Sequence, residues 1–212
     1  MKQHRAKLAR PVIWMLVILL GLPVAGLAGA NSGHKIAVHV LSHGHTCKSI
    51  PTFTDCTDIV ATYPDSGDVD IFPVFFGLTE YTVIEFGLTW PEEWGSCEYT
   101  RCTATLDIGG IANPGDGTAS AWTACQSGWS VAPGFGWLHA TGPGMVSVIP
   151  NPATGDYGTV DCASSPGPYH DPPDSVYSAG VGGLEGDEPC AEPDRGEPEG
   201  GGESGGIRGY YR

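Results

Sequence analysis

Seven cysteines behind an apolar N-terminal segment constrain this 212-residue chain more than any other feature. Residues 11–27 are apolar, and the small residues Ala28, Gly29 and Ala30 follow them. Four basic residues come first, namely Lys2, Arg5, Lys7 and Arg10. This order predicts a signal peptide over residues 1–30, cleaved after Ala30. An uncleaved membrane anchor is the alternative, but the apolar stretch is short for a span of about 20 residues.

Export places the cysteines where thiols oxidise, so we expect disulfides, with one cysteine left over. The seven are Cys47, Cys56, Cys97, Cys102, Cys125, Cys162 and Cys190. Cys47 and Cys56 flank a short loop and are the first expected pair. Cys125 is expected to pair with Cys97 or Cys102, and Cys162 with Cys190 is the third candidate. A zinc site is disfavoured because the spacing contains no Cys-x-x-Cys pair.

Residues 31–163 have the length of one domain with a substantial core. Apolar runs are short, rich in β-branched and aromatic residues, and separated by Gly, Pro, Asn and Asp. Residues 35–41 alternate, whereas residues 69–76 are apolar on both faces. A single helical turn is expected after Pro91. The pattern predicts an all-β fold, a single antiparallel β-sandwich joined by disulfides, with a barrel as the alternative.

Acidic residues dominate once the signal peptide is removed. Six basic residues then face 24 acidic ones, a net charge of −18. A surface this negative disfavours binding to nucleic acid and to anionic membranes. No second apolar run follows, so we expect no membrane insertion after cleavage. Residues 164–212 are rich in Gly, Pro and acids, and we predict that they form a disordered tail.

Two groups of polar residues could hold a metal ion. His43 and His45 are two residues apart, a spacing that allows both imidazoles to reach one ion if a third ligand, such as an Asp, comes from elsewhere. Asp65, Asp68 and Asp70 form an acidic loop that could offer oxygens to Ca²⁺, although the spacing is not that of an EF-hand. A polar strand end and a solvated turn are the favoured interpretations, so no cofactor is predicted.

Some tryptophans and neighbouring carboxylates are candidates for carbohydrate binding or hydrolysis. Trp90, Trp94 and Trp122 are candidates for stacking on sugars, although core packing is the ordinary role of such rings, and we predict that Trp90 and Trp137 are mostly buried. Glycoside hydrolysis is disfavoured because the adjacent Glu92 and Glu93 diverge. A Gly-x-Ser-x-Gly match at residues 202–206 lacks the strand and helix that a nucleophile elbow needs. No catalytic residue is predicted.

Three segments resemble a family of uncharacterised secreted proteins from environmental bacteria. They are EFGLTWPEEWGSC (85–97), DIGGIANPGDGTASAWTACQSG (107–128) and GFGWLHATGPG (134–144), and the likeness covers residues 36–162. The resemblance implies export and a β domain, with no known activity. Members carry a Cys where this chain has Ser147, and that Cys would face the equivalent of Cys162. Its absence here would explain the odd count of cysteines.

Together these features predict a secreted protein, located outside the cell, on its surface or in the periplasm. We expect a non-catalytic β-sandwich that acts as a structural or interaction module for an unknown extracellular protein or glycan. A carbohydrate-binding module and a metal-binding secreted protein are the alternatives.

Overall fold

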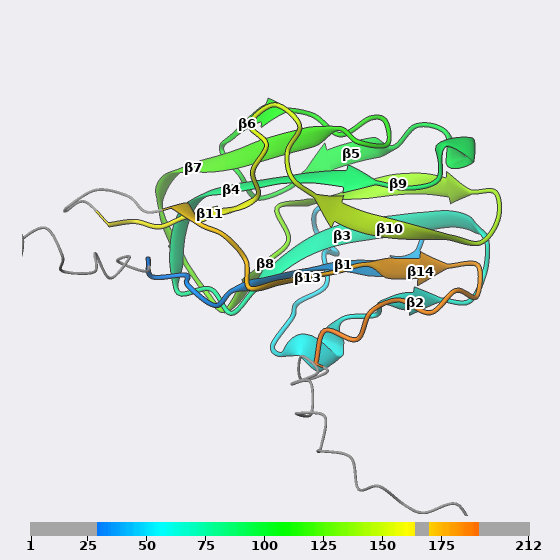
Figure 1. Cartoon of the computed structure of the whole chain (residues 1–212), viewed down its shortest axis with the longest axis horizontal. Helices are drawn as coiled ribbons and strands as arrows, with labels where there is room; N and C mark the ends of the chain where they lie inside the picture. Colours follow the sequence, from blue (N-terminus) through cyan, green and yellow to red (C-terminus); the bar gives the residue numbers. More distant parts are fainter. Residues whose placement is uncertain (1–28, 164–169, 191–212) are drawn as a thin grey trace, which may run out of the picture.

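Two β-sheets packed face to face make up the described part of the chain in this computed structural model (Figure 1). The structure describes residues 29–163 and 170–190. The predicted all-β sandwich is confirmed. Most of the predicted signal peptide, and residues 164–169 and 191–212 of the predicted tail, lie outside the described residues. Within the described ranges, no helix is both long and apolar enough to cross a membrane.

The first sheet has the strand order β13-β1-β3-β9-β5, with β8 also pairing with β3. Its centre is the antiparallel pair β1–β3, in register from Lys35 opposite Phe76 to Ser42 opposite Val69. The strands are β1 (Lys35–Ser42), β3 (Gly67–Phe76), β5 (Glu98–Arg101), β8 (Ser130–Val131), β9 (Gly134–Ala140) and β13 (Ser175–Tyr177).

The second sheet has the order β12-β11-β4-β10-β14-β2, and on the other side of β4 come β7 and then β6. Its long central strand β4 contacts β7 on one side and both β10 and β11 on the other. The strands are β2 (Thr62–Tyr63), β4 (Glu80–Thr89), β6 (Leu106–Gly109), β7 (Gly117–Ser127), β10 (Gly144–Ile149), β11 (Gly158–Val160), β12 (His170–Asp171) and β14 (Ala179–Val181).

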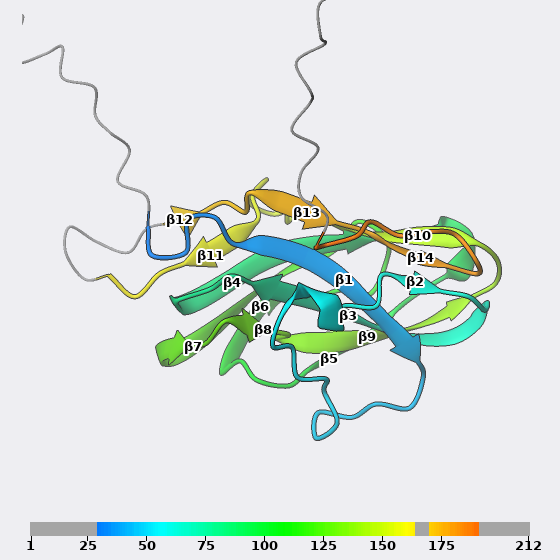
Figure 2. The same cartoon turned by 90° about the horizontal axis from the view of Figure 1, so that it is seen from below.

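Strand β3 is buried on both faces, and each face packs into a different hydrophobic cluster. Val69, Ile71 and Phe75 belong to the main core between the sheets, while Phe72 and Phe76 belong to a second cluster on the outer face. The chain between β1 and β2 covers that outer face, and it contains the 3₁₀ helix η1 (Cys56–Asp58) (Figure 2). We call residues 43–61 the covering segment. This cover explains why residues 71–76 are apolar on both faces of the strand.

A second 3₁₀ helix, η2 (Glu92–Trp94), begins after Pro91, as the sequence predicts. Its last residue, Trp94, is buried in the main core. The turn therefore joins β4 to β5 across the end of the sandwich without leaving a large ring in solvent.

The domain extends further than the sequence predicts, because residues 170–190 belong to it. Strand β13 pairs with β1, and β14 pairs with β10 and β2. Ala179 and Val181 have no exposed surface. The prediction of disorder from residue 164 onward is therefore wrong for residues 170–190. Composition misleads here because a few small apolar residues complete a buried sheet within a stretch otherwise rich in Gly, Pro and acids.

The sheets are also mixed, not purely antiparallel. Strands β1 and β13 run parallel, as do β14 and β2. Both parallel pairs involve the late segment of the chain that sequence reasoning assigned to the tail. The remaining pairs are antiparallel, so the predicted pattern holds for the main body of the sandwich.

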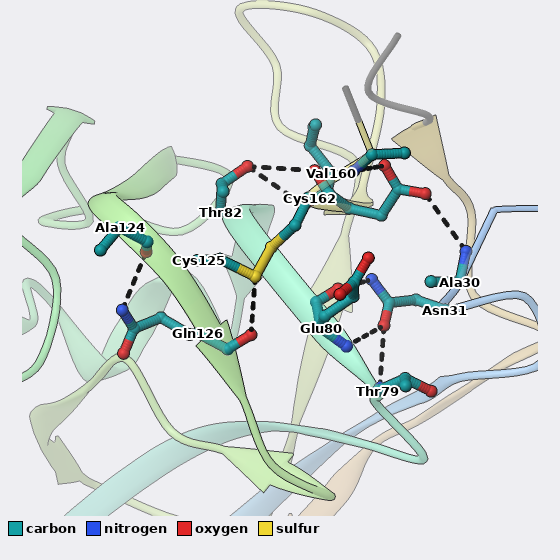
Figure 3. Close-up of a disulfide and its surroundings, with 12 residues drawn as sticks. Ala30, Asn31, Thr79, Glu80, Thr82, Ala124, Cys125, Gln126, Val160 and Cys162 are labelled. Atoms are coloured by element: carbon teal, nitrogen blue, oxygen red, sulfur yellow. Dashed lines mark hydrogen bonds between the residues drawn. A yellow bond between two sulfur atoms is a disulfide. The ribbon is translucent and has the colours of Figure 1, made fainter. Parts of the chain in front are cut away.

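Three disulfides join distant parts of the chain. The pairs are Cys47–Cys102, Cys56–Cys190 and Cys125–Cys162, with Cα–Cα distances of 5.1, 5.4 and 5.7 Å. Figure 3 shows the third, between β7 and the chain that follows β11. Two of the three pairs attach the covering segment to the rest of the domain. The bonds therefore tie strands and loops whose sequence separations are 55, 134 and 37 residues.

The predicted presence of disulfides and of one leftover cysteine is confirmed, but every predicted pairing is wrong. Cys47 and Cys56 are not joined to each other, because each tethers one end of the covering segment to a different element. Cys162 pairs with Cys125, so neither Cys190 nor a cysteine at position 147 is its partner here. The leftover thiol is the buried Cys97.

Candidate functional site

The tryptophans proposed for sugar binding do not form an open platform. Trp90 and Trp94 are each 4% exposed, which confirms the predicted burial of Trp90. The Trp90 indole N–H donates to the Gly95 carbonyl at 2.9 Å. Trp122 is half-buried against Tyr81, with ring centroids 5.2 Å apart, and Trp137 is half-buried, less covered than predicted. Trp90 and Trp94 stabilise the core, so stacking on a sugar is not available to them.

The fully buried carboxylate of Asp70 is hydrogen-bonded to both His43 and His45, the two histidines paired in the sequence analysis. Its Oδ1 lies 2.8 Å from Nδ1 of His43, and its Oδ2 lies 3.0 Å from Nδ1 of His45. The backbone N–H groups of Gly44 and His45 also donate to Oδ2, at 2.9 and 2.8 Å. A carboxylate without exposed surface needs such donors. Asp70 therefore fixes the first residues of the covering segment where β1 ends.

A second histidine–aspartate pair lies beside the first on the same face of β3. Asp68 is two residues before Asp70, and its Oδ1 lies 2.6 Å from Nδ1 of His139 on β9. The His139 interaction is the largest cause that lowers the pKa of Asp68. This pair is exposed, in contrast to Asp70. Asp65 precedes β3 and is exposed. The three aspartates thus occupy different environments and do not form the compact oxygen cage that Ca²⁺ requires.

The spacing of His43 and His45 allowed a shared metal ion as the alternative to a polar strand end, and the structure brings both imidazoles onto Asp70. Among residues 29–163 and 170–190, however, the group of three potential ligands whose donor atoms lie within 4.8 Å of one another is Glu80, Cys125 and Cys162. The two sulfurs of that group form a disulfide, so they are not available as thiolates. His43 and His45 retain Nε2 as a potential ligand atom, because Asp70 contacts only Nδ1 of each ring.

A second candidate site lies at the side of the sandwich where the edge strands β5 and β6 border a groove. Among the described strands, β5 pairs only with β9 and β6 only with β7, so each is the last strand of its sheet. The two edges lie on the same side of the molecule (Figure 1) and border a groove of about 480 Å³. Arg101 of β5 reaches across to Asp107 of β6, with Nε and Oδ2 3.7 Å apart. Unpaired strand edges offer backbone donors and acceptors to a further strand.

Strand β6 presents apolar side chains to solvent. Leu106 and Ile108 are 54% and 64% exposed, the most exposed large apolar residues of the described chain. The alternation of β6 explains this, because Asp107 on the other face accepts a hydrogen bond from the buried Ser120 at 2.6 Å. Ala119 and Ala121 lie opposite Ile108 and Leu106 on β7. These four residues form the β6–β7 apolar patch.

Sequence reasoning missed this patch. The sequence contained one usable signal, the alternation of Leu106, Asp107 and Ile108 beside a strand rich in Ala, Ser and Thr. That signal shows which residues share a face. It does not show that β6 lies at a sheet edge, which depends on pairing between distant segments.

The free thiol of Cys97 borders the groove but is not a reactive group. Burial, and to a lesser extent the charge of Glu98, raises the pKa of Cys97 to about 12. The thiol belongs to the main core, close to Gly136, where an added Cβ would lie 2.5 Å from the sulfur. Nucleophilic cysteines require the thiolate. Cys97 therefore packs as an apolar residue.

Comparison with known proteins finds one distant structural likeness and no sequence relative. No family model matches the chain, and no curated protein matches it. A type II cohesin domain from the cellulosome of Acetivibrio cellulolyticus has a similar structure, with a TM-score of 0.42 and 8% sequence identity, covering 71% of this chain and 95% of that domain. So distant a likeness carries no argument about function.

Proposed function

We propose that the chain is exported and that its β-sandwich is a non-catalytic interaction module, which binds an extended segment of a partner protein at the β5–β6 side. The observation that carries this proposal is the unpaired edge strand β6, with Leu106 and Ile108 exposed on it. Three disulfides support maturation in an oxidising compartment, outside the cytoplasm.

Recognition by strand addition fits the chemistry of this edge. An added strand gains main-chain hydrogen bonds along β6, while its alternate side chains contact the apolar patch. Burial of an Ile or Leu side chain contributes about 1.5–3 kcal/mol, so Leu106 and Ile108 suit the role of anchors. The acidic balance of the chain, 24 acidic against 10 basic residues, favours a neutral or basic partner segment.

Crosslinking tests the proposal on the exported protein. A photo-crosslinking amino acid at position 108 should capture one defined protein, whereas the same group at position 184 should not. Leu184 is a suitable control because it is 40% exposed and lies near β14, away from β6 in the same sheet. The captured partner is then purified and its binding measured directly.

The affinity of the identified partner for two variants tests whether β6 is the binding site. Ile108→Asp should weaken binding of the identified partner by at least about tenfold, as expected for an interface anchor. Leu184→Asp should change it less than about twofold. Equal effects of the two variants would contradict the proposal. Crosslinks only between copies of this chain, or binding of glycan at β6, would also contradict it.

Transition-metal binding is a second candidate, favoured by the contact of both His43 and His45 with Asp70. A carboxylate that holds Nδ1 leaves Nε2 as the ligand atom, an arrangement common around metal-binding histidines. Calorimetric titration with Zn²⁺ should then show one site that is lost in a His43→Gln, His45→Gln double variant and kept in His139→Gln. Retention of the same affinity in the double variant would exclude the site.

A further inference from the structure

The peptide bond that we expect signal peptidase to cleave lies against two buried carboxylates. Asp171 on β12 accepts from the backbone N–H of Gly29 at 2.9 Å and of Asn31 at 3.0 Å, through different oxygens. Asp161, after β11, accepts from the N–H of Ala30 at 3.2 Å. Asp161 and Asp171 are only 2% and 3% exposed. Three successive amides at the Ala30–Asn31 junction therefore face two aspartates.

Asn31 is held by its own contacts, independently of the residues before it. Its side chain has no exposed surface, and its Nδ2 donates to the Glu80 carbonyl at 2.6 Å. Its Oδ1 accepts from the Thr79 N–H at 3.0 Å, as Figure 3 shows. Its carbonyl lies 2.9 Å from Nδ1 of the buried His34. Removal of residues 1–30 therefore leaves the backbone nitrogen of Asn31 in place beside Asp171.

From this placement we propose that the mature N-terminus is an ionic anchor: cleavage after Ala30 creates an α-ammonium on Asn31 that pairs with Asp171 and Asp161. The inference rests on the proposed export. Hydrolysis adds one water to the Ala30–Asn31 amide, which gives a carboxylate on Ala30 and an ammonium on Asn31. The exporting cell's signal peptidase supplies the catalyst, acting before the domain folds and buries the bond.

Charge favours the processed form, and the number of donors is unchanged. Cleavage removes the Gly29 and Ala30 amides, which donate to Oδ1 of Asp171 and Oδ2 of Asp161. The new ammonium has three protons, enough to keep Oδ2 of Asp171 and to reach the two oxygens that lost a donor. Charge-assisted hydrogen bonds are roughly twice as strong as neutral ones. A buried carboxylate such as Asp171 is also better balanced by a cation than by amides alone.

The anchor links the start of the mature chain to a region formed late in the sequence. Asp161 and Asp171 flank the connection between β11 and β12, and Asn31 binds the first residues of β4.

Pairing with the aspartates should raise the pKa of the Asn31 α-amine above its ordinary value of about 8. Its stabilisation is then complete below about pH 8 and is lost as the pH rises through the raised pKa.

A comparison of two N-termini with two variants tests the anchor. One form begins at Asn31 and the other at Ala25, so that the second keeps Gly29 and Ala30 as amides. Asp171→Asn removes the charge with little change of shape. Asp65→Asn is the matched control, because it makes the same charge change at an exposed position. Thermal unfolding is measured at pH 6.5 and at pH 10 with the disulfides intact.

We expect Asp171→Asn to lower the melting temperature of the Asn31 form by about 4 °C or more at pH 6.5, and that of the Ala25 form by less than half as much. At pH 10 the difference between the forms should shrink. The Asn31 amine should also react with an amine-directed reagent at least about tenfold slower in the folded than in the unfolded protein. Asp65→Asn should leave both forms unchanged.

Equal loss in the two forms, or an α-amine equally reactive when folded, would overturn the anchor. These forms are prepared with defined first residues, so the result does not depend on natural processing. Mass spectrometry of the naturally exported protein tests the premise separately. A natural N-terminus other than Asn31 would contradict the processing step even if the carboxylates bind an ammonium in the prepared form.

Discussion

Replacing Asp70 should destabilise the domain far more than replacing Asp68, although both contact a histidine from the same face of β3. Asp70→Ala leaves the N–H groups of Gly44 and His45 and two imidazoles without their acceptor. Each donor that loses its acceptor in a buried site costs about 1–3 kcal/mol. Because His43 and His45 retain some contact with solvent, we expect a total loss near 3 kcal/mol.

Asp68→Ala is the matched control because it removes one histidine contact at an exposed site. The side chains of Asp68 and His139 are 50% and 62% exposed, so solvent replaces the lost interaction. Exposed pairs of this kind contribute about 0–1 kcal/mol. Urea unfolding at pH 7 with intact disulfides gives both free energies. Losses that agree within about 1 kcal/mol would refute the view that Asp70 anchors the covering segment.

Three further predictions concern His39, Cys97 and the Cys125–Cys162 disulfide. Burial lowers the pKa of His39 to about 4, so its neutral form is favoured in the folded state, and stability should fall by roughly 3 kcal/mol as the pH drops from 6.5 to 4. His39→Gln should flatten that pH dependence in urea titrations. Cys97 should resist iodoacetamide in the native protein and react once when the oxidised protein is denatured, as counted by mass spectrometry. Replacing Cys125 and Cys162 together by Ser should lower the unfolding free energy by about 3–4 kcal/mol, given their separation of 37 residues.

The fold class was readable from the sequence because its signals are local. The alternation of residues 35–41 and the doubly apolar run at residues 69–76 correspond to β1 and β3. The turn after Pro91 also forms as predicted. Each of these features depends on neighbouring residues, through the spacing of apolar side chains along a strand or the turn preference of proline.

Disulfide pairing and sheet edges were not readable, since both depend on which distant segments meet. Cys56 and Cys190 are 134 residues apart, and no local pattern joins them. The same applies to Asp70, whose partners come from the end of β1. The sequence singled out His43 and His45 as residues able to share a metal ion, whereas the structure joins both imidazoles to Asp70 through Nδ1, a contact that the sequence did not predict. The exposed face of β6 was missed for the same reason.

Composition gave the domain boundary incorrectly at its C-terminal end. Residues 170–190 resemble a disordered tail by their content of Gly, Pro and acids, yet Ala179 and Val181 are buried between neighbouring strands. Averaging over a window hides the few residues that make contact. A cysteine at position 190 was the available hint, because a disulfide partner must lie on an ordered surface.

The central claim is that the chain is exported and that its cysteines form disulfides between distant segments. Peptide mapping of the exported protein by mass spectrometry under non-reducing conditions tests this claim most directly. We predict a mature N-terminus at Asn31, three crosslinked peptide pairs joining Cys47 to Cys102, Cys56 to Cys190 and Cys125 to Cys162, and an unmodified Cys97. Recovery of the chain as a reduced intracellular species that still begins at Met1 would contradict it.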